Sequence, residues 1–372
     1  MMSGDGLVVR VRPWLGELST TQALGLAGLA QTYGTGVLEL TSRANVQVRG
    51  IAEEDHGRVL DVLDALELLD ESAAAEHVRN IILTPYRAQS DAFDHEAMAA
   101  ALMAGLLRPD YAALPSKFGF VIDAQDQRHL QGISGDIRIE RGSSGVLVRL
   151  DGKAEGWSVA NVDEATELAL TLVSWFLASG GVGSDGRGRM ARHLENGAVP
   201  PLPDTPSVTP FETAKRRQEG MAQDGAIVAL AFGQLSAAAL TALADAAGEE
   251  PLRITPHRTV FVPNATTVPA HPDLILEPND PLLRVTACPG APGCSQASVP
   301  TRGLARRLAG HVPIDRHLHV SGCAKGCAKS VACDYTLVGR GGTFDLVEHG
   351  AAWDEATRTG LSPDDALALI ED

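Results

Sequence analysis

Cysteine is scarce in this chain of 372 residues, which has five, and no apolar run is long. The most apolar segment, Leu168 to Ala178, is far shorter than the roughly 20 residues of a membrane-spanning helix. The first residues lack the charged stretch and apolar run of a secretory signal. Basic residues are also in deficit, 31 against 47 acidic, and the net charge of −16 argues against attraction to nucleic acid or anionic membranes. We therefore expect a cytoplasmic protein with no nucleic-acid or membrane partner.

Four of the five cysteines gather in two tight pairs, which indicates a ligand site. Five residues separate Cys288 from Cys294, and three separate Cys323 from Cys327. Thiolates hold iron–sulfur clusters, and a [4Fe–4S] cube takes four of them. Zinc knuckles favour two to four residues between paired cysteines, and disulfides suit small secreted domains. We interpret the pairs as cluster ligands, with zinc and structural thiols as alternatives.

A concentration of cations lies near the N-terminus. Residues 7–12 read L-V-V-R-V-R, a predicted strand with Arg10 and Arg12 on one face. A second predicted strand runs from Val37 to Arg49, with one apolar and one polar face. A half-solvated sheet would show the same alternation, but these cations in an acidic protein favour an anion-binding surface. The polar face carries Arg43, Asn45, Gln47 and Arg49.

The remaining pattern alternates strands and helices. Ser19 is a candidate N-cap for a helix through about Tyr33, with Leu24, Ala27 and Leu29 facing inward. The first elements are therefore predicted in the order β-α-β-α. The pattern further predicts a helix from Glu54 to about Leu69, then loop and helix from Ile81 to about Leu114, with a core helix over Glu96 to Leu107. Strands are predicted in F-G-F-V-I-D, D-I-R-I-E and G-V-L-V-R-L, and a helix from Val162 to Ala178 is capped by Asn161 or Asp163. The chain is predicted to end with a hairpin from Tyr335 to Val347, which turns at Gly341-Gly342, and a helix from Pro363.

The first unit recurs in the second half of the chain, which predicts a duplication with pseudo-two-fold architecture. The segment D-G-A-I-V-A-L-A-F-G-Q-L-S matches D-G-L-V-V-R-V-R-P-W-L-G-E-L-S in pattern. Ser19 pairs with Ser236, and Thr41 with Thr255. The second copy has mostly lost the anion face, because Arg43, Asn45 and Gln47 correspond there to His257, Thr259 and Phe261.

The cysteine motif, T-A-C-P-G-A-P-G-C followed later by S-G-C-A-K-G-C, resembles that of the sulfite and nitrite reductases. The resemblance implies that Cys288, Cys294, Cys323 and Cys327 hold a [4Fe–4S] cluster, and that Cys327 also bridges to the iron of sirohaem. The segments L-V-V-R-V-R and L-T-S-R-A-N-V-Q-V-R-G resemble the ferredoxin-like half-domain of these enzymes, which grips the carboxylates of the macrocycle. By resemblance, the tetrapyrrole-binding residues are Arg10, Arg43, Asn45, Gln47, Arg49, Arg79 and Lys117.

The candidate catalytic residues are Arg79 and Lys117. Arg79-Asn80 resembles a family Arg-Asn pair whose arginine reaches the distal pocket. The reductases then carry two lysines two residues apart, which neutralise and protonate the bound oxyanion; here Lys117 keeps the first and Gly119 occupies the second. Loss of a cationic donor should weaken such a reduction by about 2 kcal/mol or more. We therefore expect a distal pocket that is not tuned for sulfite or nitrite.

The expected fold class is α+β, a duplicated sulfite/nitrite reductase-like architecture with two ferredoxin-like half-domains. The glycine-rich run at 180–189 lacks the spacing of a nucleotide loop and is read as a flexible connection. Cys333 is expected to be a buried free thiol, and Lys325 to tune the cluster potential. The expected domains are a first half-domain at 1–75, an α/β domain at 76–199, a linker at 200–210, a second half-domain at 211–280 and the cluster-binding domain at 281–372.

The opening R-V-R-P-W-L-G, the cysteine loops and Gly119 most resemble the precorrin-3B synthase branch of this superfamily. That branch acts on a tetrapyrrole, precorrin-3A, in aerobic cobalamin biosynthesis, where it uses dioxygen and an electron donor to hydroxylate a ring-bridging carbon and close a lactone. The resemblance thus implies an oxidoreductase, a monooxygenase with a [4Fe–4S] cluster. The alternatives are a sirohaem-dependent assimilatory nitrite or sulfite reductase and a zinc-stabilised binding protein. The branch is also associated with a mononuclear non-haem iron, for which the loose candidates are His257, His311, His317 and His319.

Overall fold

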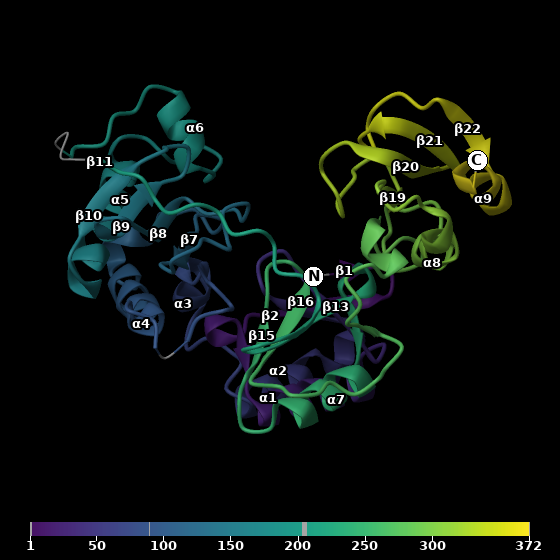
Figure 1. The fold of residues 1–372 in the computed structure, drawn as a ribbon, viewed down its shortest axis with the longest axis horizontal. Helices are drawn as coiled ribbons and strands as arrows, with labels where there is room; N and C mark the ends of the chain where they lie inside the picture. Colours follow the sequence, from purple (N-terminus) through teal and green to yellow (C-terminus); the bar gives the residue numbers. More distant parts are fainter. Residues whose placement is uncertain (1, 89, 203–206, 372) are drawn as a thin grey trace.

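A computed structural model describes residues 2–88, 90–202 and 207–371 and shows an α+β protein of three lobes (Figure 1). Two half-domains pack together in the lower centre of the view. An α/β lobe, in blue to teal, lies to the left, and a C-terminal lobe, in yellow, lies to the right. Of the predicted linker at 200–210, residues 203–206 lie outside the described residues. No helix in the described ranges is long and apolar enough to cross a membrane.

The first half-domain is built on a five-stranded sheet in the order β1-β2-β5-β4-β14. The predicted single strand from Val37 to Arg49 is wrong, because the chain turns after Leu40 and forms an antiparallel hairpin. Thr41 Oγ1 closes this turn by accepting from the backbone N–H groups of Arg43 and Asn45 at 3.3 and 3.1 Å. The observed order of elements is therefore β-α-β-β-α. The strands are β1 (Met2–Ser3), β2 (Gly6–Val11), β4 (Val37–Leu40), β5 (Val46–Ile51) and β14 (Gln234–Ser236).

The first helix, α1 (Thr20–Tyr33), begins where its cap predicts. Ser19 and Gln22 form a reciprocal capping box, which satisfies two backbone N–H groups at the helix start. Ala27 and Leu29 are buried as expected, but Leu24 is 40% exposed because the inward face is made by neighbouring alanines and leucines instead. Helix α2 (His56–Ala65) is shorter than predicted, since residues 53–55 form a separate 3-10 turn.

The second half-domain repeats the first and exchanges strands with it, which confirms the predicted duplication. Strand β3 of the first copy pairs with β15 of the second, and β14 of the second copy pairs with β4 of the first. Helices α1 and α7 pack against each other, and one hydrophobic core draws on both copies. The half-domains therefore form a single folding unit. Its second sheet contains β12 (Gly220–Ala222), β13 (Gly225–Leu230), β16 (Thr259–Pro263), β15 (Leu252–Ile254), β3 (Glu17–Leu18) and β17 (Leu274–Ile275), and α7 spans Ala237–Ala247.

The α/β lobe has a six-stranded sheet in the order β11-β10-β9-β8-β7-β6, parallel from β6 to β8 and antiparallel beyond. Helix α5 has its predicted limits, and Asn161 caps it by accepting from the backbone of Glu164. Strand β6 was not predicted, because three apolar residues are too few to show alternation. The elements are β6 (Ile81–Leu83), β7 (Phe120–Asp123), β8 (Ile137–Gly142), β9 (Gly145–Leu150), β10 (Gly156–Val159), β11 (Ser207–Val208), α3 (Ala73–Val78), α4 (His95–Leu106), α5 (Val162–Ala178) and α6 (Met190–Glu195).

The C-terminal lobe repeats this pattern, so the duplication extends beyond the half-domains. Three parallel strands are again followed by antiparallel strands, here two of them. The backbone of Cys288 donates to Val320 just as that of Thr84 donates to Ile122. The predicted hairpin and terminal helix are confirmed. The elements are β18 (Val285–Ala287), α8 (Arg302–Leu308), β19 (Leu318–Ser321), β20 (Cys333–Arg340), β21 (Thr343–Gly350), β22 (Arg358–Leu361) and α9 (Pro363–Glu371).

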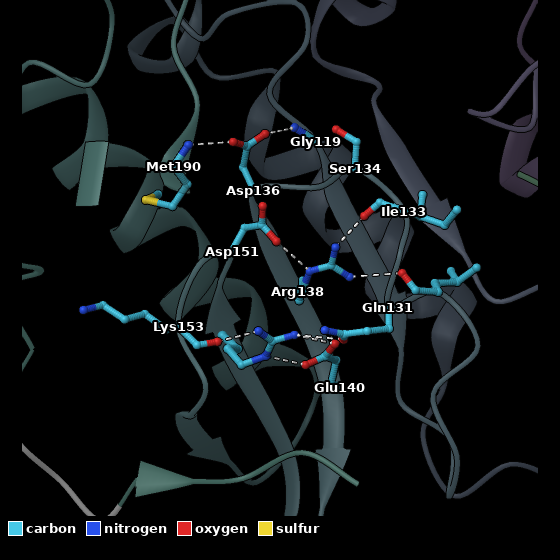
Figure 2. Close-up of polar contacts among 12 residues, drawn as sticks. Gly119, Gln131, Ile133, Ser134, Asp136, Arg138, Glu140, Asp151, Lys153 and Met190 are labelled. Carbon is cyan, nitrogen blue, oxygen red and sulfur yellow. Dashed lines mark hydrogen bonds and ion pairs between the residues drawn. The ribbon is translucent and has the colours of Figure 1, made fainter. Parts of the chain in front are cut away.

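A buried polar cluster fixes the loop that precedes β8 (Figure 2). Arg149 donates to both carboxylate oxygens of Glu140 at 2.6 and 2.8 Å. Arg138 donates to Asp151 at 3.1 Å and to the backbone carbonyl of Leu130 at 3.2 Å. Each buried charge has an opposite charge beside it, which offsets the cost of removing both from water. The loop leads to Asp136, whose carboxylate accepts from the backbone N–H of Gly119 at 2.9 Å.

Candidate active site

The two half-domains and the α/β lobe line a cavity that opens to solvent, and the space between its walls, open solvent included, is about 760 Å³. No acidic residue is among its described lining residues, although the whole protein carries a net charge of −16. Such a concentration of cations favours an anionic ligand. Six arginines line the cavity, namely Arg10, Arg12, Arg43, Arg79, Arg87 and Arg253.

Arg79 is held rigidly at the wall of this cavity. Its guanidinium pairs with Asp70 at 2.7 Å and lies over the Trp14 ring, 5.8 Å from the centroid. The next residue, Asn80, also lines the cavity. The predicted Arg-Asn pair thus lies beside the half-domain arginines, with its cation oriented by an acid and an aromatic ring.

Two lining arginines escaped the sequence interpretation. Arg87 and Arg253 come from different lobes and share the carboxylate of Glu17, to which Arg253 donates at 2.9 Å. Arg253 also donates to the backbone carbonyl of Pro85 at 3.0 Å. Only the strand exchange brings these residues together, so local spacing carried no signal for them.

Arg43 differs from its neighbours because its guanidinium has no hydrogen-bond or ion-pair partner among the described residues. It sits in the β4–β5 turn beside Ala44, which has a φ of 54°, and Asn45, and all three line the cavity. Burial, followed by the positive charge of Arg189, lowers the pKa of Arg43. Its side chain is therefore half-buried, and the carboxylate of Asp136 offsets its charge only in part, so an anion in the cavity would stabilise it.

Two further residues of the predicted polar face lead from the cavity towards the cysteines. The amide oxygen of Gln47, turned towards Arg10, accepts from its Nη2 at 3.1 Å. Arg49 donates to Asp5 at 3.0 Å and to the carbonyl of Gly293, next to Cys294. Arg49 is thus occupied in fixing a cysteine loop, a positioning role that was not predicted.

Lys117 and Gly119 occupy different environments. Lys117 is exposed and is not among the cavity-lining residues, whereas Ser116 is. A Cβ at Gly119 would lie 2.5 Å from the side-chain nitrogen of Asn80, which itself donates to the carbonyl of Phe118 at 3.1 Å. A side chain at position 119 would therefore displace Asn80.

The four predicted ligand cysteines are gathered by the ends of two parallel strands. Cys288 directly follows β18 and Cys323 follows β19, and since these strands are parallel neighbours their loops emerge at the same edge. Burial, followed by the thiols of Cys323, Cys288 and Cys294, raises the pKa of Cys327. The other three thiols thus lie within electrostatic reach of Cys327.

The donor set fits an iron–sulfur cluster. The backbone N–H of Gly322 donates to the sulfur of Cys288 at 3.1 Å, the type of contact that tunes cluster sulfur. Gly290 adopts a φ of 66°, and a Cβ there would lie 2.6 Å from Thr301 Oγ1, so the loop passes close to its neighbours. Among the described residues, no three His, Cys, Asp or Glu side chains converge on a single-ion site. A [4Fe–4S] cluster takes four thiolates, one at each iron, and Cys288, Cys294, Cys323 and Cys327 are the four that these loops supply.

Cys333 stands apart from the ligand cysteines. It is buried, and its thiol donates to the carbonyl of His317 at 3.1 Å, as expected for a structural thiol. The loose iron candidates are dispersed: His257 lines a pocket of the second half-domain, and His319 is fully buried within the C-terminal sheet. No histidine triad for a mononuclear iron is found in the described part of the chain.

Comparisons with known proteins agree with this geometry. Residues 1–66 match the family described as the nitrite/sulfite reductase ferredoxin-like half domain. A precorrin-3B synthase from Sinorhizobium sp. is 28% identical, over 95% of this chain and 81% of its own length. A ferredoxin–nitrite reductase from Synechococcus elongatus is 24% identical, over 89% of this chain and 76% of its own.

The fold is also found among solved structures. The NirA protein of Mycobacterium tuberculosis superposes on 98% of this chain, and on 79% of its own, with a TM-score of 0.63 and 18% identity. Residues 1–66 thus resemble the ferredoxin-like half domain of nitrite and sulfite reductases, and the chain as a whole has the fold of the NirA protein.

Proposed function

We propose that this protein is a precorrin-3B synthase that hydroxylates precorrin-3A with dioxygen and closes a lactone on it. A relative of that name, similar over nearly the whole chain, supports the proposal. The observation that carries it is the course of the polar side chains, which runs from Arg43 in the cavity, through Gln47 and Arg10, to Arg49 at the cysteine loop. A ring laid along this course would reach both the arginine cavity and the thiols.

Arginine suits such a ligand. The guanidinium stays charged at every physiological pH and binds a carboxylate through two parallel hydrogen bonds. Each such bond contributes about 1.5–3 kcal/mol. We propose that Arg10, Arg43 and Asn45 bind carboxylate arms of the tetrapyrrole, together with the cavity arginines that acids already orient.

The other proposed roles follow from position. Arg79, fixed by Asp70, would orient the reacting edge of the ring, and exposed Lys117 would exchange protons with solvent. Cys288, Cys294, Cys323 and Cys327 would hold a [4Fe–4S] cluster, which supplies one-electron transfer. One oxygen atom of dioxygen enters the product and the other leaves as water, so the reaction consumes two electrons and two protons from an external donor.

A sirohaem-dependent reductase is the second candidate, because a nitrite reductase is also similar over most of the chain. Gly119 favours the synthase. The close approach of Asn80 leaves no room for a second cation at this position, and an arginine-lined cavity binds anions without readily giving up protons. The ultraviolet–visible spectrum of the purified protein separates the two: an intense sirohaem band supports the reductase, and a plain brown cluster spectrum supports the synthase.

The decisive experiment is incubation of the reconstituted enzyme with precorrin-3A and a chemical reductant under oxygen-18 gas. Mass spectrometry should show a product heavier by one labelled oxygen atom. A protein that carries the cluster and binds the substrate, yet forms no labelled product with any reductant tried, would exclude the proposed activity.

A further inference from the structure

His319 lies in β19, and neither of its ring nitrogens has a hydrogen-bond partner among the described residues. The residue is 0% exposed. Burial, followed by the charge of Lys329, lowers the pKa of His319 to about 4, so its ring is uncharged at neutral pH and offers one N–H donor and one acceptor nitrogen. Burying such groups without partners is unfavourable, and the ring is therefore placed to contact a group that the polypeptide does not itself supply.

The Cys288 side chain lies on the same face of the sheet as the His319 ring. Strand β18 pairs in parallel with β19, with Thr286 opposite His319 and Ala287 opposite Val320. The ladder continues to Cys288, whose backbone N–H donates to Val320 at 3.3 Å. Because side chains alternate between faces, Cys288 shares the face of Thr286 and therefore that of His319. The thiol and the ring are diagonal neighbours on adjacent strands, a spacing of roughly 7–8 Å that long side chains can span.

The α/β lobe, which repeats this sheet without the cysteines, has an apolar core at the same place. Val121 in β7 is the counterpart of His319, since each is the second residue of its strand to pair with the strand before it, and Val121 packs in an apolar cluster with Leu130. The same length of chain joins the next pair of parallel strands in both lobes, so the counterpart of Leu130 is Ala328. The cysteine-bearing lobe thus has a polar ring and a smaller neighbour where the other lobe has packed apolar side chains.

A cluster bound at Cys288 would lie over the face that carries His319. The thiol of Cys288 belongs to a residue that is only 9% exposed, so the corner of the cluster that it holds is buried. Cluster sulfur accepts hydrogen bonds, and each such bond favours the reduced cluster, which is the more negative state. Gly322 already donates its backbone N–H to the Cys288 sulfur at 3.1 Å. A ring N–H on the sheet face would add a second donor at the same corner.

We propose that His319 donates a hydrogen bond from its ring to a sulfur atom of the cluster at the Cys288 corner, and that this bond raises the reduction potential of the cluster. The inference rests on the cluster of the proposed function and deepens it, because it names a residue that would control electron transfer without being an iron ligand. From the sequence alone, His319 was only a loose candidate for a mononuclear iron.

The test is a reductive titration of the reconstituted full-length protein against redox dyes of known potential. His319→Leu removes the donor, and it should fold because the counterpart position carries the apolar Val121. The equilibrium constant for one-electron reduction of the cluster should fall about tenfold, the worth of one hydrogen bond to a charged acceptor. His319→Gln keeps an N–H donor and should stay within about threefold of the wild type. The matched control is His349→Asn, in the same lobe, which removes a side chain that is 70% exposed and lies 3.9 Å from Asp334; it should change the constant by less than about twofold.

Pulsed electron paramagnetic resonance of the reduced protein, labelled with nitrogen-15 histidine, decides the case even if His319→Leu loses iron. The wild type should show one histidine nitrogen coupled to the cluster spin, and His319→Gln should lose this coupling. An unchanged reduction constant in an iron-loaded His319→Leu, or a coupling that is absent from the wild type or persists in His319→Gln, would overturn the inference and leave a buried water as the partner of the ring. A wild type that holds no cluster would overturn the ligand assignment as well. A wild type that shows the coupling and forms no labelled product from precorrin-3A would overturn only the proposed activity.

Discussion

Cys327 and Cys333 lie six residues apart and have opposite surroundings. Cys327 is exposed and lies within the field of three other thiols, whereas Cys333 is buried against a backbone carbonyl. Cys327→Ser should therefore abolish the cluster, because a hydroxyl at this position does not replace a thiolate. Iron and acid-labile sulfide per chain should fall to near zero.

Cys333→Ser is the matched control, since its hydroxyl can donate to the same carbonyl of His317. Iron content should stay at the wild-type value. A brown Cys327→Ser protein with full iron, or loss of iron in Cys333→Ser, would contradict the ligand assignment.

Site residues could be predicted from the sequence where their role depends on residues close to them in the chain. The cysteine pairs could be recognised because each pair lies within one short loop. Arg49 could not be assigned its contact with Gly293, nor Arg189 its contact with Asp136, since these partners are 244 and 53 residues away. Polar residues on a predicted face show that a site exists, and only the fold shows which of them are already occupied.

The cysteines lie on loops, and the first of these loops can pass close to Thr301 only because residue 290 is a glycine. An Ala at this position would bring its Cβ within 2.8 Å of the backbone nitrogen of Thr301, besides being strained at a φ of 66°. Gly290→Ala should therefore displace the loop and reduce cluster occupancy by half or more. Gly341→Ala has similar strain, with a φ of 56°, and meets nothing within 4 Å. Equal iron content in the two variants would show that close packing of the loop is unimportant.

The free energy of unfolding should depend on pH through Asp123, the last residue of β7. Burial raises the pKa of Asp123 to about 6, although the backbone N–H groups of Leu130 and His129 bind its carboxylate. The folded state thus holds this proton more tightly than the unfolded chain, whose carboxyl has a pKa of about 4. The resulting stabilisation is present below pH 4 and is lost as the pH rises through 6.

Asp123→Asn, which resembles the protonated acid, should remove this dependence. Between pH 4 and pH 7 the wild type should lose up to about 3 kcal/mol of unfolding free energy relative to the variant. Urea denaturation at both pH values measures it, with exposed Asp126→Asn as the control. A pH-independent difference between wild type and Asp123→Asn would refute the raised pKa.

Helices and strands could be predicted where a capping residue or a sustained periodic spacing of apolar residues marked them, as in α1 and α5. The hairpin of β4 and β5 was read as one strand, because β-propensity continues through the turn and Thr41 closes it without a glycine or proline. Alternation therefore placed Arg43 and Asn45 on a strand face that does not exist. They still reach the cavity, because the turn points into it.

At the scale of the whole molecule, the two half-domains share one core, and a defect in one should weaken both. Leu18 is fully buried in β3, which completes the sheet of the other copy. Leu18→Ala should cost about 2–5 kcal/mol. Hydrogen exchange should then accelerate in β2 and β5 as well as in β15 and β16, whereas Leu172→Ala, in the separate core of the α/β lobe, should act mainly there. Loss of protection confined to one half-domain would refute the shared unit.

The exchanged strands also separate the order of synthesis from the order of folding. Strand β4 leaves the ribosome with its outer edge open, and the strand that covers this edge, β14, is made only after a further lobe has been translated. An open edge invites pairing with other chains. Nascent chains that end anywhere before residue 236 should thus aggregate and be sensitive to proteases. Residues 1–66, which match the half-domain family, should therefore not form a stable domain on their own.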